Sequence, residues 1–512
     1  MGEPLLIGID LGTTACKAAV FSKDGSILAL SYREYPLIRV SVRKIEQNAE
    51  EWWVLVKDAI KECTNMLSYE NRMCIKALSI SAQGISFVPI DAEGRPTANA
   101  ISWLDSRAEE EALELVNTFG KDEIYWKTGI QANPVYILPK IIWLKKNRPD
   151  IYKKTHRFCT SLDFLMSRLT GKFVTDHSMA GGSLMHDVRK LEWSPELLKT
   201  ADIDKEQLPE LDWAGSVVGP VLKELVHELG IPEDTLIVLG GHDQECAGIG
   251  AGLQPGVMTI SFGTASILLA CTEKVLFDKY MRVPCIPSIE KNKWVMEAVV
   301  SVGGAGQKWI RDFMNGFAEH LFTGDKQIPE IDYDKVVSIA QKTEIGASGL
   351  FFYPHMTGAT SPYWIPSATG VFHGISLSTS MAHMVRAVME GWIFQIKTNF
   401  NVLKEFTYEP EKVILFGGGA KDPFIRQLTA DVLNKPVLVT ETTETALLGA
   451  SILAGVGCGI YKDIPSAQSE VIRLKECICP IEENVQKASD IYRKYLNIEE
   501  IVLATAIPKK YG

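Results

Sequence analysis

The sequence lacks the features that mark zinc-binding, secreted, membrane and nucleic-acid-binding proteins. Its ten cysteines form no Cys-x-x-Cys pair and its nine histidines no His-Glu-x-x-His spacing, so no structural zinc site is predicted. No apolar run reaches the roughly 18 residues that cross a bilayer, and the first residues lack a secretory-signal pattern. Acidic residues outnumber basic ones by 63 to 53, which argues against a nucleic-acid-binding face. We therefore expect a cytoplasmic protein with reduced thiols and with no nucleic-acid or membrane partner.

Two common nucleotide-binding motifs are also missing. The sequence contains no GxxxxGK[ST] loop and no GxGxxG fingerprint, so neither a P-loop nor a Rossmann site is predicted. The hydrophobic fraction of 46% and the charged fraction of 23% are those of a globular protein. At about 150 residues per domain, the length predicts two to four domains.

Short apolar runs alternate with amphipathic stretches along the chain, which predicts α/β layers. The turn-rich stretch 252–256 marks the expected domain boundary. The apolar stripe of residues 381–396 is expected to be core. The expected strands are residues 5–9, 17–21, 27–30, 77–81, 235–240, 257–262, 267–270 and 413–416, and the expected helices are residues 51–67, 141–146, one starting near 380, and 423–433.

Glycine turns directly follow three of these apolar strands, at residues 12–14, 263–265 and 417–420. Glycine lets backbone amides approach phosphate oxygens, and threonine hydroxyls add donors. Any one such turn could be a ligand-free hairpin, but together with two nearby acidic residues they favour a site for nucleotide phosphates. The first two turns each lie between two strands, which suggests two domains of related design.

The two acidic residues are Asp10 and Asp243, each at or just past the end of an apolar strand and two residues from a glycine. Taken singly, Asp10 could cap a turn and Asp243 could be a helix N-cap. Ligands of layered α/β folds bind at the carboxyl ends of strands, so the pair together suggests phosphoryl transfer. Asp10 would hold Mg²⁺ near the phosphates. Asp243 would take the proton of the attacking hydroxyl, a role worth roughly 10²–10⁴ in rate.

These stretches jointly resemble the FGGY family of carbohydrate kinases, which belongs to the superfamily of sugar kinases, Hsp70 and actin. The resemblance runs from about residue 5 to about residue 462. It is carried by residues 9–14 (IDLGTT), 103–107 (WLDSR), 140–144 (KIIWL), 241–244 (GHDQ), 374–395 and 416–433.

The resemblance implies an ATP-dependent kinase of a sugar or polyol. The implied fold is α/β, with two actin-like (ribonuclease H-like) domains and a catalytic cleft between them. Residues 1–253 would be the sugar-binding side and residues 254–512 the nucleotide-binding side. Asp243 matches the catalytic base and Asp10 the acid associated with Mg²⁺, and both are expected at the metal. The expected nucleotide contacts are Gly12, Thr13, Thr14, Lys17, Gly263, Thr264, Gly304, Gly418, Gly419 and Ala420.

The same resemblance implies sugar contacts in the N-terminal half, at Gln83, Trp103, Asp105, Asp243 and Gln244. From the residues alone, Trp103 could instead be core, and Asp105 could form a surface ion pair with Arg107. Lys308 falls where glycerol kinases carry glutamine, so it is left outside the site.

The expected sugar pocket is xylulokinase-like in frame but not in its loop. Residues 83–86 read Gln-Gly-Ile-Ser, without the Arg-Glu of glycerol kinases or the Gln-Met-His-Gly of xylulokinases. Residues 81–84 are closer to the loop of erythritol kinases. The alternatives are therefore a polyol kinase of erythritol or glycerol type, or a non-catalytic, nucleotide-gated, actin-like binding module. The expected ligands are a sugar or polyol, ATP and Mg²⁺, and the chain could form a homodimer.

Overall fold

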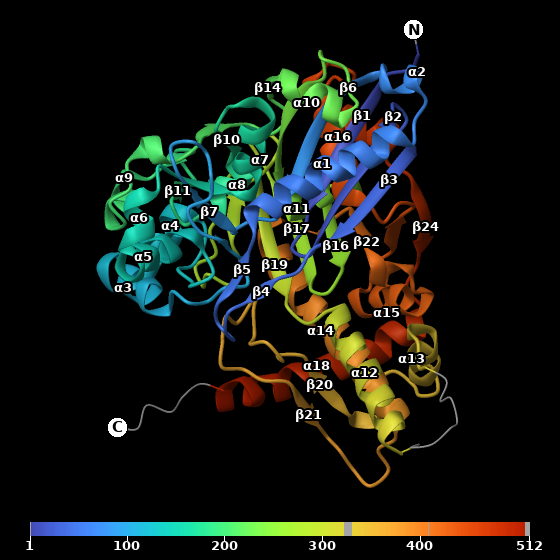
Figure 1. Ribbon diagram of the computed structural model, residues 1–512. Helices are drawn as coiled ribbons and strands as arrows, with labels where there is room; N and C mark the ends of the chain where they lie inside the picture. The colour runs from blue at the N-terminus through green and yellow to red at the C-terminus, as the bar shows by residue number, and fades with distance from the viewer. Residues whose placement is uncertain (1, 322–329, 408, 507–512) are drawn as a thin grey trace. The chain divides into compact units, whose positions relative to one another are not determined.

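The computed structural model describes residues 2–321, 330–407 and 409–506, which fall into two compact units (Figure 1). The first unit comprises Met1–Pro255, Cys271–Met296 and Glu444–Ile472, and the second comprises Gly256–Ala270, Glu297–Thr443 and Arg473–Gly512. The expected domains, 1–253 and 254–512, are successive stretches, whereas both units are discontinuous. None of the helices in the described part of the chain has the length and apolarity that a bilayer crossing requires.

The first unit is built on a six-stranded sheet in the order β14-β15-β6-β1-β2-β3. β1, β6 and β15 are parallel, β2 and β3 continue as an antiparallel meander, and β14 is antiparallel to β15. The parallel strands are buried on both faces, which explains their continuous apolar sequences. The strand bounds are Leu5–Leu11 (β1), Ala15–Ser22 (β2), Ile27–Glu34 (β3), Ile75–Ala82 (β6), Val217–Pro220 (β14) and Leu236–His242 (β15).

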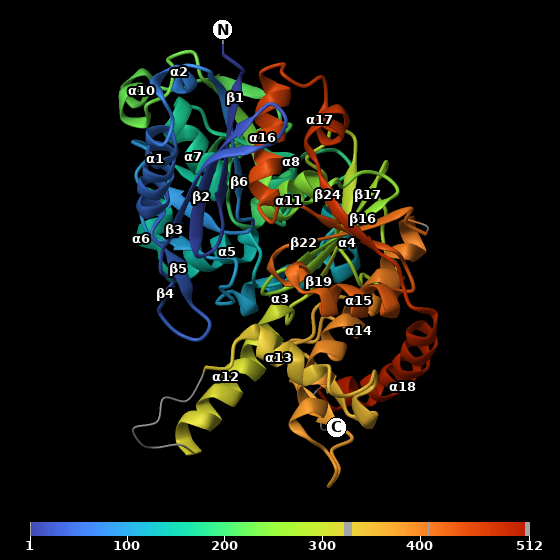
Figure 2. The same cartoon turned by 90° about the vertical axis from the view of Figure 1, so that its right-hand side faces the viewer.

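Helices cover both faces of this sheet (Figure 2). On one face, α1 (Ala49–Asn65) buries Trp52 in the same hydrophobic cluster as Ile7. On the other face, α16 (Thr445–Gly457) buries Leu448 in the same cluster as Leu6. Successive residues of β1 thus pack against helices on opposite faces of the sheet, because side chains alternate along a strand.

A smaller sheet and its helices complete the first unit. The sheet has the order β4-β5-β8-β7-β9, and α5 packs against α3 and α6 beside it. The strand bounds are Ile38–Arg39 (β4), Ile45–Gln47 (β5), Phe87–Ile90 (β7), Ala100–Ile101 (β8), Arg157–Thr160 (β9), Val174–Asp176 (β10), His186–Asp187 (β11), Glu192–Trp193 (β12), Glu210–Asp212 (β13) and Cys285–Pro287 (β18). The helix bounds are Tyr69–Arg72 (α2), Glu109–Phe119 (α3), Lys121–Thr128 (α4), Ile137–Asn147 (α5), Pro149–Lys154 (α6), Ser161–Thr170 (α7), His177–Gly181 (α8), Pro195–Thr200 (α9), Lys223–Leu229 (α10), Asp243–Ala251 (α11) and Ile464–Val471 (α17).

The second unit repeats the local topology of the first. Its strands bond in the order β19-β17-β16-β22-β23-β24. β16 is antiparallel to β17 and parallel to β22, just as β1 is antiparallel to β2 and parallel to β6. The strand bounds are Val257–Phe262 (β16), Ser266–Thr272 (β17), Trp294–Val300 (β19), Phe351–Tyr353 (β20), Val371–His373 (β21), Lys412–Phe416 (β22), Val437–Thr440 (β23) and Leu474–Ile478 (β24). The helix bounds are Gly304–Leu321 (α12), Tyr333–Ala340 (α13), Met381–Thr407 (α14), Pro423–Leu433 (α15) and Glu482–Ala506 (α18).

Most sequence-based element predictions are confirmed, and the mixed α/β class with them. The helix expected at 423–433 has those bounds, and the helix expected near 380 is α14, which is buried from Val385 onward. All ten cysteines are free thiols.

Glycines set how closely α11 and α16 approach each other. A Cβ on Gly250 would lie 1.9 Å from the carbonyl oxygen of Thr445, and one on Gly449 would lie 1.9 Å from that of Cys246. Both obstacles are backbone atoms, which cannot swing aside. The two helices therefore pack with their backbones in contact.

We predict that Gly250→Ala and Gly449→Ala each lower the free energy of unfolding by about 1–3 kcal/mol, because the added methyl forces these backbones apart. Gly316→Ala is the matched control: it lies in α12 with no atom within 4 Å of its Cβ position. It should raise stability by about 0.5–1 kcal/mol through helix propensity. Denaturant unfolding measures all three, and equal effects at the three positions would contradict the packing account.

Candidate active site

The strands of the first unit bring Asp10 and Asp243 to one edge of the sheet. Asp10 on β1 is in register with Ser81 on β6, and Ser81 is in register with Gly241 on β15. A bulge between Val238 and Gly241 shifts this last register. Because β1, β6 and β15 are parallel, their carboxyl ends meet at the same edge, where ligands of α/β folds bind.

The Asp10 carboxylate is half-buried and close to other charges. The Ser81 hydroxyl donates to its Oδ1 at 2.8 Å. Burial is the main reason that the pKa of Asp10 is raised to about 7, and the charge of Asp243 is the second reason. The charge of Lys17 lowers the pKa. The two carboxylates are thus near enough for the charge of one to disfavour ionisation of the other.

Asp243 is the first residue of α11, directly after β15. Its Oδ1 accepts the backbone N–H of Gln244 at 2.7 Å, and burial raises its pKa to about 6. The helix N-terminus favours the ionised form. Asp243 is therefore a carboxylate at neutral pH with more basicity than an exposed aspartate.

The glycine turn after β1 is tied to a tryptophan. Gly12 N–H closes the turn by donating to Ala15 O at 2.9 Å, and the indole N–H of Trp103 donates to Thr13 Oγ1 at 2.8 Å. Lys17 pairs with Glu444 at 2.7 Å. Trp103 is 37% exposed, so the alternative that it is plain core is wrong.

Gln83 and Asp105, expected at the sugar, are buried and hydrogen-bonded to protein groups. The Gln83 amide N–H lies 3.3 Å from the hydroxyl of Tyr35, and its carbonyl oxygen accepts from Ser86 at 3.3 Å. Asp105 accepts the Ile45 N–H at 2.6 Å and pairs with Arg107 at 2.7 Å. The Asp105 side chain has no exposed surface and that of Arg107 only 5%, so the pair is buried, not a surface pair as the sequence allowed. Sequence alone misses this because β5, which covers the pair, is distant along the chain.

The second unit gathers the other expected nucleotide contacts around one cavity of about 940 Å³. Gly263, Thr264, Gly304, Gly418 and Gly419 line it, whereas Ala420 is buried behind it. The Gly304 N–H donates to Gly263 O at 2.9 Å, which ties the turn after β16 to the start of α12. Glycine backbones and a helix N-terminus on one cavity suit phosphate binding.

Some other cavity residues lie outside the motifs found in the sequence. Gln307, Tyr333 and Val337 come from α12 and α13, whereas Phe424 of α15 belongs to the stretch 416–433 that carries the family resemblance. Lys308, left outside the site on the sequence, is part of the lining and pairs with Asp312.

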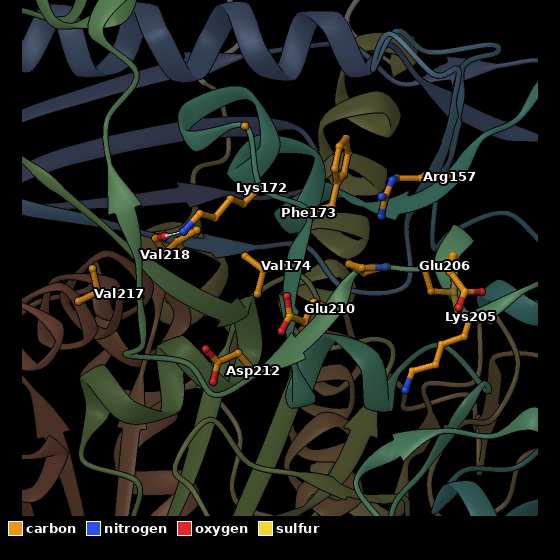
Figure 3. A pocket seen from close by; sticks show the side chains of 13 residues that line it. Arg157, Lys172, Phe173, Val174, Lys205, Glu206, Glu210, Asp212, Val217 and Val218 are labelled. Carbon is orange, nitrogen blue, oxygen red and sulfur yellow. Dashed lines mark hydrogen bonds between the residues drawn. The ribbon is translucent and has the colours of Figure 1, made fainter.

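A second hollow, of about 680 Å³, lies in the first unit, and neither Asp10 nor Asp243 lines it (Figure 3). Arg157, Lys172, Lys205, Glu210 and Asp212 line it, and the Lys172 ammonium donates to Val218 O at 2.6 Å. None of the sequence-predicted site residues borders it.

Two family models cover most of the chain. Residues 5–250 match the N-terminal domain, and residues 258–458 the C-terminal domain, of the FGGY family of carbohydrate kinases. This chain belongs to the FGGY family of carbohydrate kinases. It is therefore an enzyme that phosphorylates a sugar or polyol, as the sequence predicted, and the alternative of a non-catalytic module is set aside.

Individual FGGY relatives act on different sugars. The chain is 29% identical to a xylulose kinase of Bacillus subtilis over 96% of both chains. Among solved structures, a gluconate kinase from Lactobacillus acidophilus is 27% identical with a TM-score of 0.90, covering 99% of both chains. A ligand-bound xylulose kinase from the same organism is 27% identical with a TM-score of 0.89, covering 98% of this chain and 99% of that one.

We predict that Asp10→Asn stabilises this FGGY kinase at pH 8 and that the gain shrinks toward pH 5. The folded-state pKa of about 7 exceeds the unfolded value of about 3.9. The folded state therefore binds more protons between these values, and stability falls as pH rises through this window. Asp10→Asn removes the ionisable group and with it this loss of stability, so we expect it to raise Tm at pH 8 by a few degrees.

Thermal unfolding from pH 5 to pH 8 measures the effect. Asp234→Asn, at an exposed loop position, is the control, measured at the same pH values. A pH-independent shift for Asp10→Asn would contradict the assigned pKa.

Proposed function

We propose that Asp243 accepts the proton of the acceptor hydroxyl while ATP donates its γ-phosphoryl group. The observation that carries this is the placement of Asp243: a carboxylate with a pKa of about 6 at the N-terminus of α11, at the sheet edge it shares with Asp10. A base works best when its pKa lies near the operating pH. Asp243 is ionised at pH 7.5 yet basic enough to take a proton.

The transfer itself requires little covalent work from the protein. The hydroxyl oxygen forms a bond to the γ-phosphorus, its proton passes to Asp243, and the bond between the γ-phosphorus and the bridging oxygen breaks with its electron pair on ADP. Positioning and charge neutralisation dominate this chemistry. The glycine-lined cavity of the second unit, with Gly263, Thr264 and Gly418, is proposed to hold the nucleotide.

The turn after β1 supplies a second set of phosphate donors in this proposal. Gly12, Thr13 and Thr14 follow β1 directly, and Lys17 lies opposite Asp10 on β2. The Lys17 ammonium pairs with Glu444 at 2.7 Å.

The residues present fit Mg²⁺. Asp10 and Asp243 offer hard oxygen ligands whose mutual repulsion a cation would relieve. No cluster of three or more metal-ligating side chains occurs among residues 2–321, 330–407 and 409–506, which suits an ion that takes its remaining ligands from phosphates and water. When bound, Mg²⁺ would neutralise phosphate charge.

A neutral acceptor such as xylulose is proposed over an aldonate such as gluconate, because three basic side chains of the first unit are already engaged by protein groups. Lys17 is paired with Glu444, Arg107 with Asp105, and the side-chain nitrogen of buried Lys140 donates to Ser102 O at 2.7 Å. A substrate carboxylate would have to compete with these partners for a cation. Because the chain is similar to a gluconate kinase, an aldonate is the alternative acceptor to test.

A homodimer and a cytoplasmic location stay predictions.

Asp243→Asn should lower kcat by at least about 100-fold while leaving ATP binding intact, because the amide cannot accept the proton. A coupled ADP-release assay measures kcat, and calorimetry with a non-hydrolysable ATP analogue measures binding. Asp234→Asn serves as the exposed control. Full activity of Asp243→Asn would refute the assigned role.

The acceptor is tested by ADP release over a panel of pentuloses, pentoses, tetritols, glycerol and hexonates. We expect kcat/KM to be at least about tenfold higher for a neutral pentulose than for gluconate, which corresponds to roughly 1.4 kcal/mol of transition-state binding. A preference for gluconate would overturn the neutral-acceptor proposal and leave the assignment of Asp243 untouched.

A further inference from the structure

The loop after β6 contains a strained turn. Ile85 has φ 65°, and the Ser86 N–H donates to Gly84 O at 2.8 Å, which closes a three-residue turn around Ile85. A β-branched residue in this region is an outlier that surrounding contacts must hold in place. Ile85 packs on the hydrophobic cluster that contains Phe87 and Leu138.

This turn holds Gly84 directly against the imidazole of His242. A Cβ on Gly84 would lie 2.0 Å from Cδ2 and 2.1 Å from Nε2 of His242. Gly84 is not among the glycines with positive φ. Position 84 therefore requires glycine because a side chain would collide with His242, not because the backbone adopts a conformation that favours glycine.

The backbone of His242 is hydrogen-bonded, and its side chain lies beside Asp243. Its backbone N–H donates to Ser178 Oγ at 3.0 Å, and the Ser178 hydroxyl donates to Asp176 Oδ2 at 2.5 Å. The His242 side chain is 11% exposed, and its Nδ1 lies 3.7 Å from Asp243 Oδ1. Since Oδ1 also accepts the Gln244 N–H, both neighbours approach the same oxygen.

We propose that His242 is a positioning residue for Asp243, seated in space that Gly84 leaves open. The Gln244 N–H holds Oδ1, and the imidazole, whose Nδ1 lies 3.7 Å from the same oxygen, fills the space beside the carboxylate, which leaves Oδ2 for the acceptor hydroxyl. The strained turn at Ile85 keeps the backbone of residue 84 against the ring, so the ring cannot rotate away. This inference rests on the proposed role of Asp243 as the proton acceptor.

A double-mutant cycle tests the coupling between the two positions. Gly84→Ala places a methyl where the ring lies and should lower kcat at least tenfold, with the KM for ATP unchanged. His242→Ala should lower kcat similarly. In the double variant the methyl has room, so its kcat should match that of His242→Ala alone. Gly219→Ala, whose Cβ would approach only the end of Lys172, at 3.8 Å, is the control and should keep wild-type kcat.

Replacements of intermediate size separate positioning from an unspecific loss of stability. His242→Asn and His242→Leu keep a side chain beside the carboxylate and should keep kcat within about threefold, whereas His242→Ala leaves that space open and should lose at least tenfold. Thermal unfolding of each variant shows whether it folds, and an unfolded Leu variant leaves the Asn and Ala pair to decide.

Equal kcat for His242→Asn and His242→Ala, or effects of Gly84→Ala and His242→Ala that multiply in the double variant, would overturn the inference. Activity that survives Asp243→Asn would instead remove the proposed function on which it rests.

Discussion

The site in the first unit depends on the confinement of two carboxylates to one sheet edge. Asp10 and Asp243 lie at the carboxyl ends of parallel strands and are partly withdrawn from water, so each is harder to ionise than a free aspartate. An isolated pair of this kind costs stability. In a sugar kinase, a bound cation and the acceptor hydroxyl would offset this cost, because both interact favourably with carboxylates.

The packing beneath this edge is equally constrained. α11, which begins with Asp243, is held against α16 by backbone contacts at Gly250 and Gly449. α16 lies in turn on β1, where a Cβ on Gly8 would lie 2.2 Å from Leu447 O. Small residues thus bring α11, which begins with Asp243, and α16 close to the strand of Asp10. Glu444, which immediately precedes α16, pairs with Lys17.

Local patterns were enough to predict the strands, the main helices and the two acidic strand ends, because each depends on residues a few positions apart. The buried pair of Asp105 and Arg107 was not predictable, since the segment that covers it comes from another part of the chain. The contact between Gly84 and His242 was likewise invisible, because nothing in the sequence says that residues so far apart share one space. The discontinuity of both units has the same origin: residues 444–472 return to the first sheet only through tertiary packing.

The charge coupling of the two carboxylates can be measured directly by carbon-13 NMR titration of aspartate side chains, with Asp10 assigned by its substitution. The account predicts that Asp10 titrates near pH 7 in the native enzyme and at a lower pH, still above the unfolded value of about 3.9, when Asp243 is replaced by asparagine. An Asp10 that titrates near pH 4, or one that does not respond to the loss of Asp243, would contradict it.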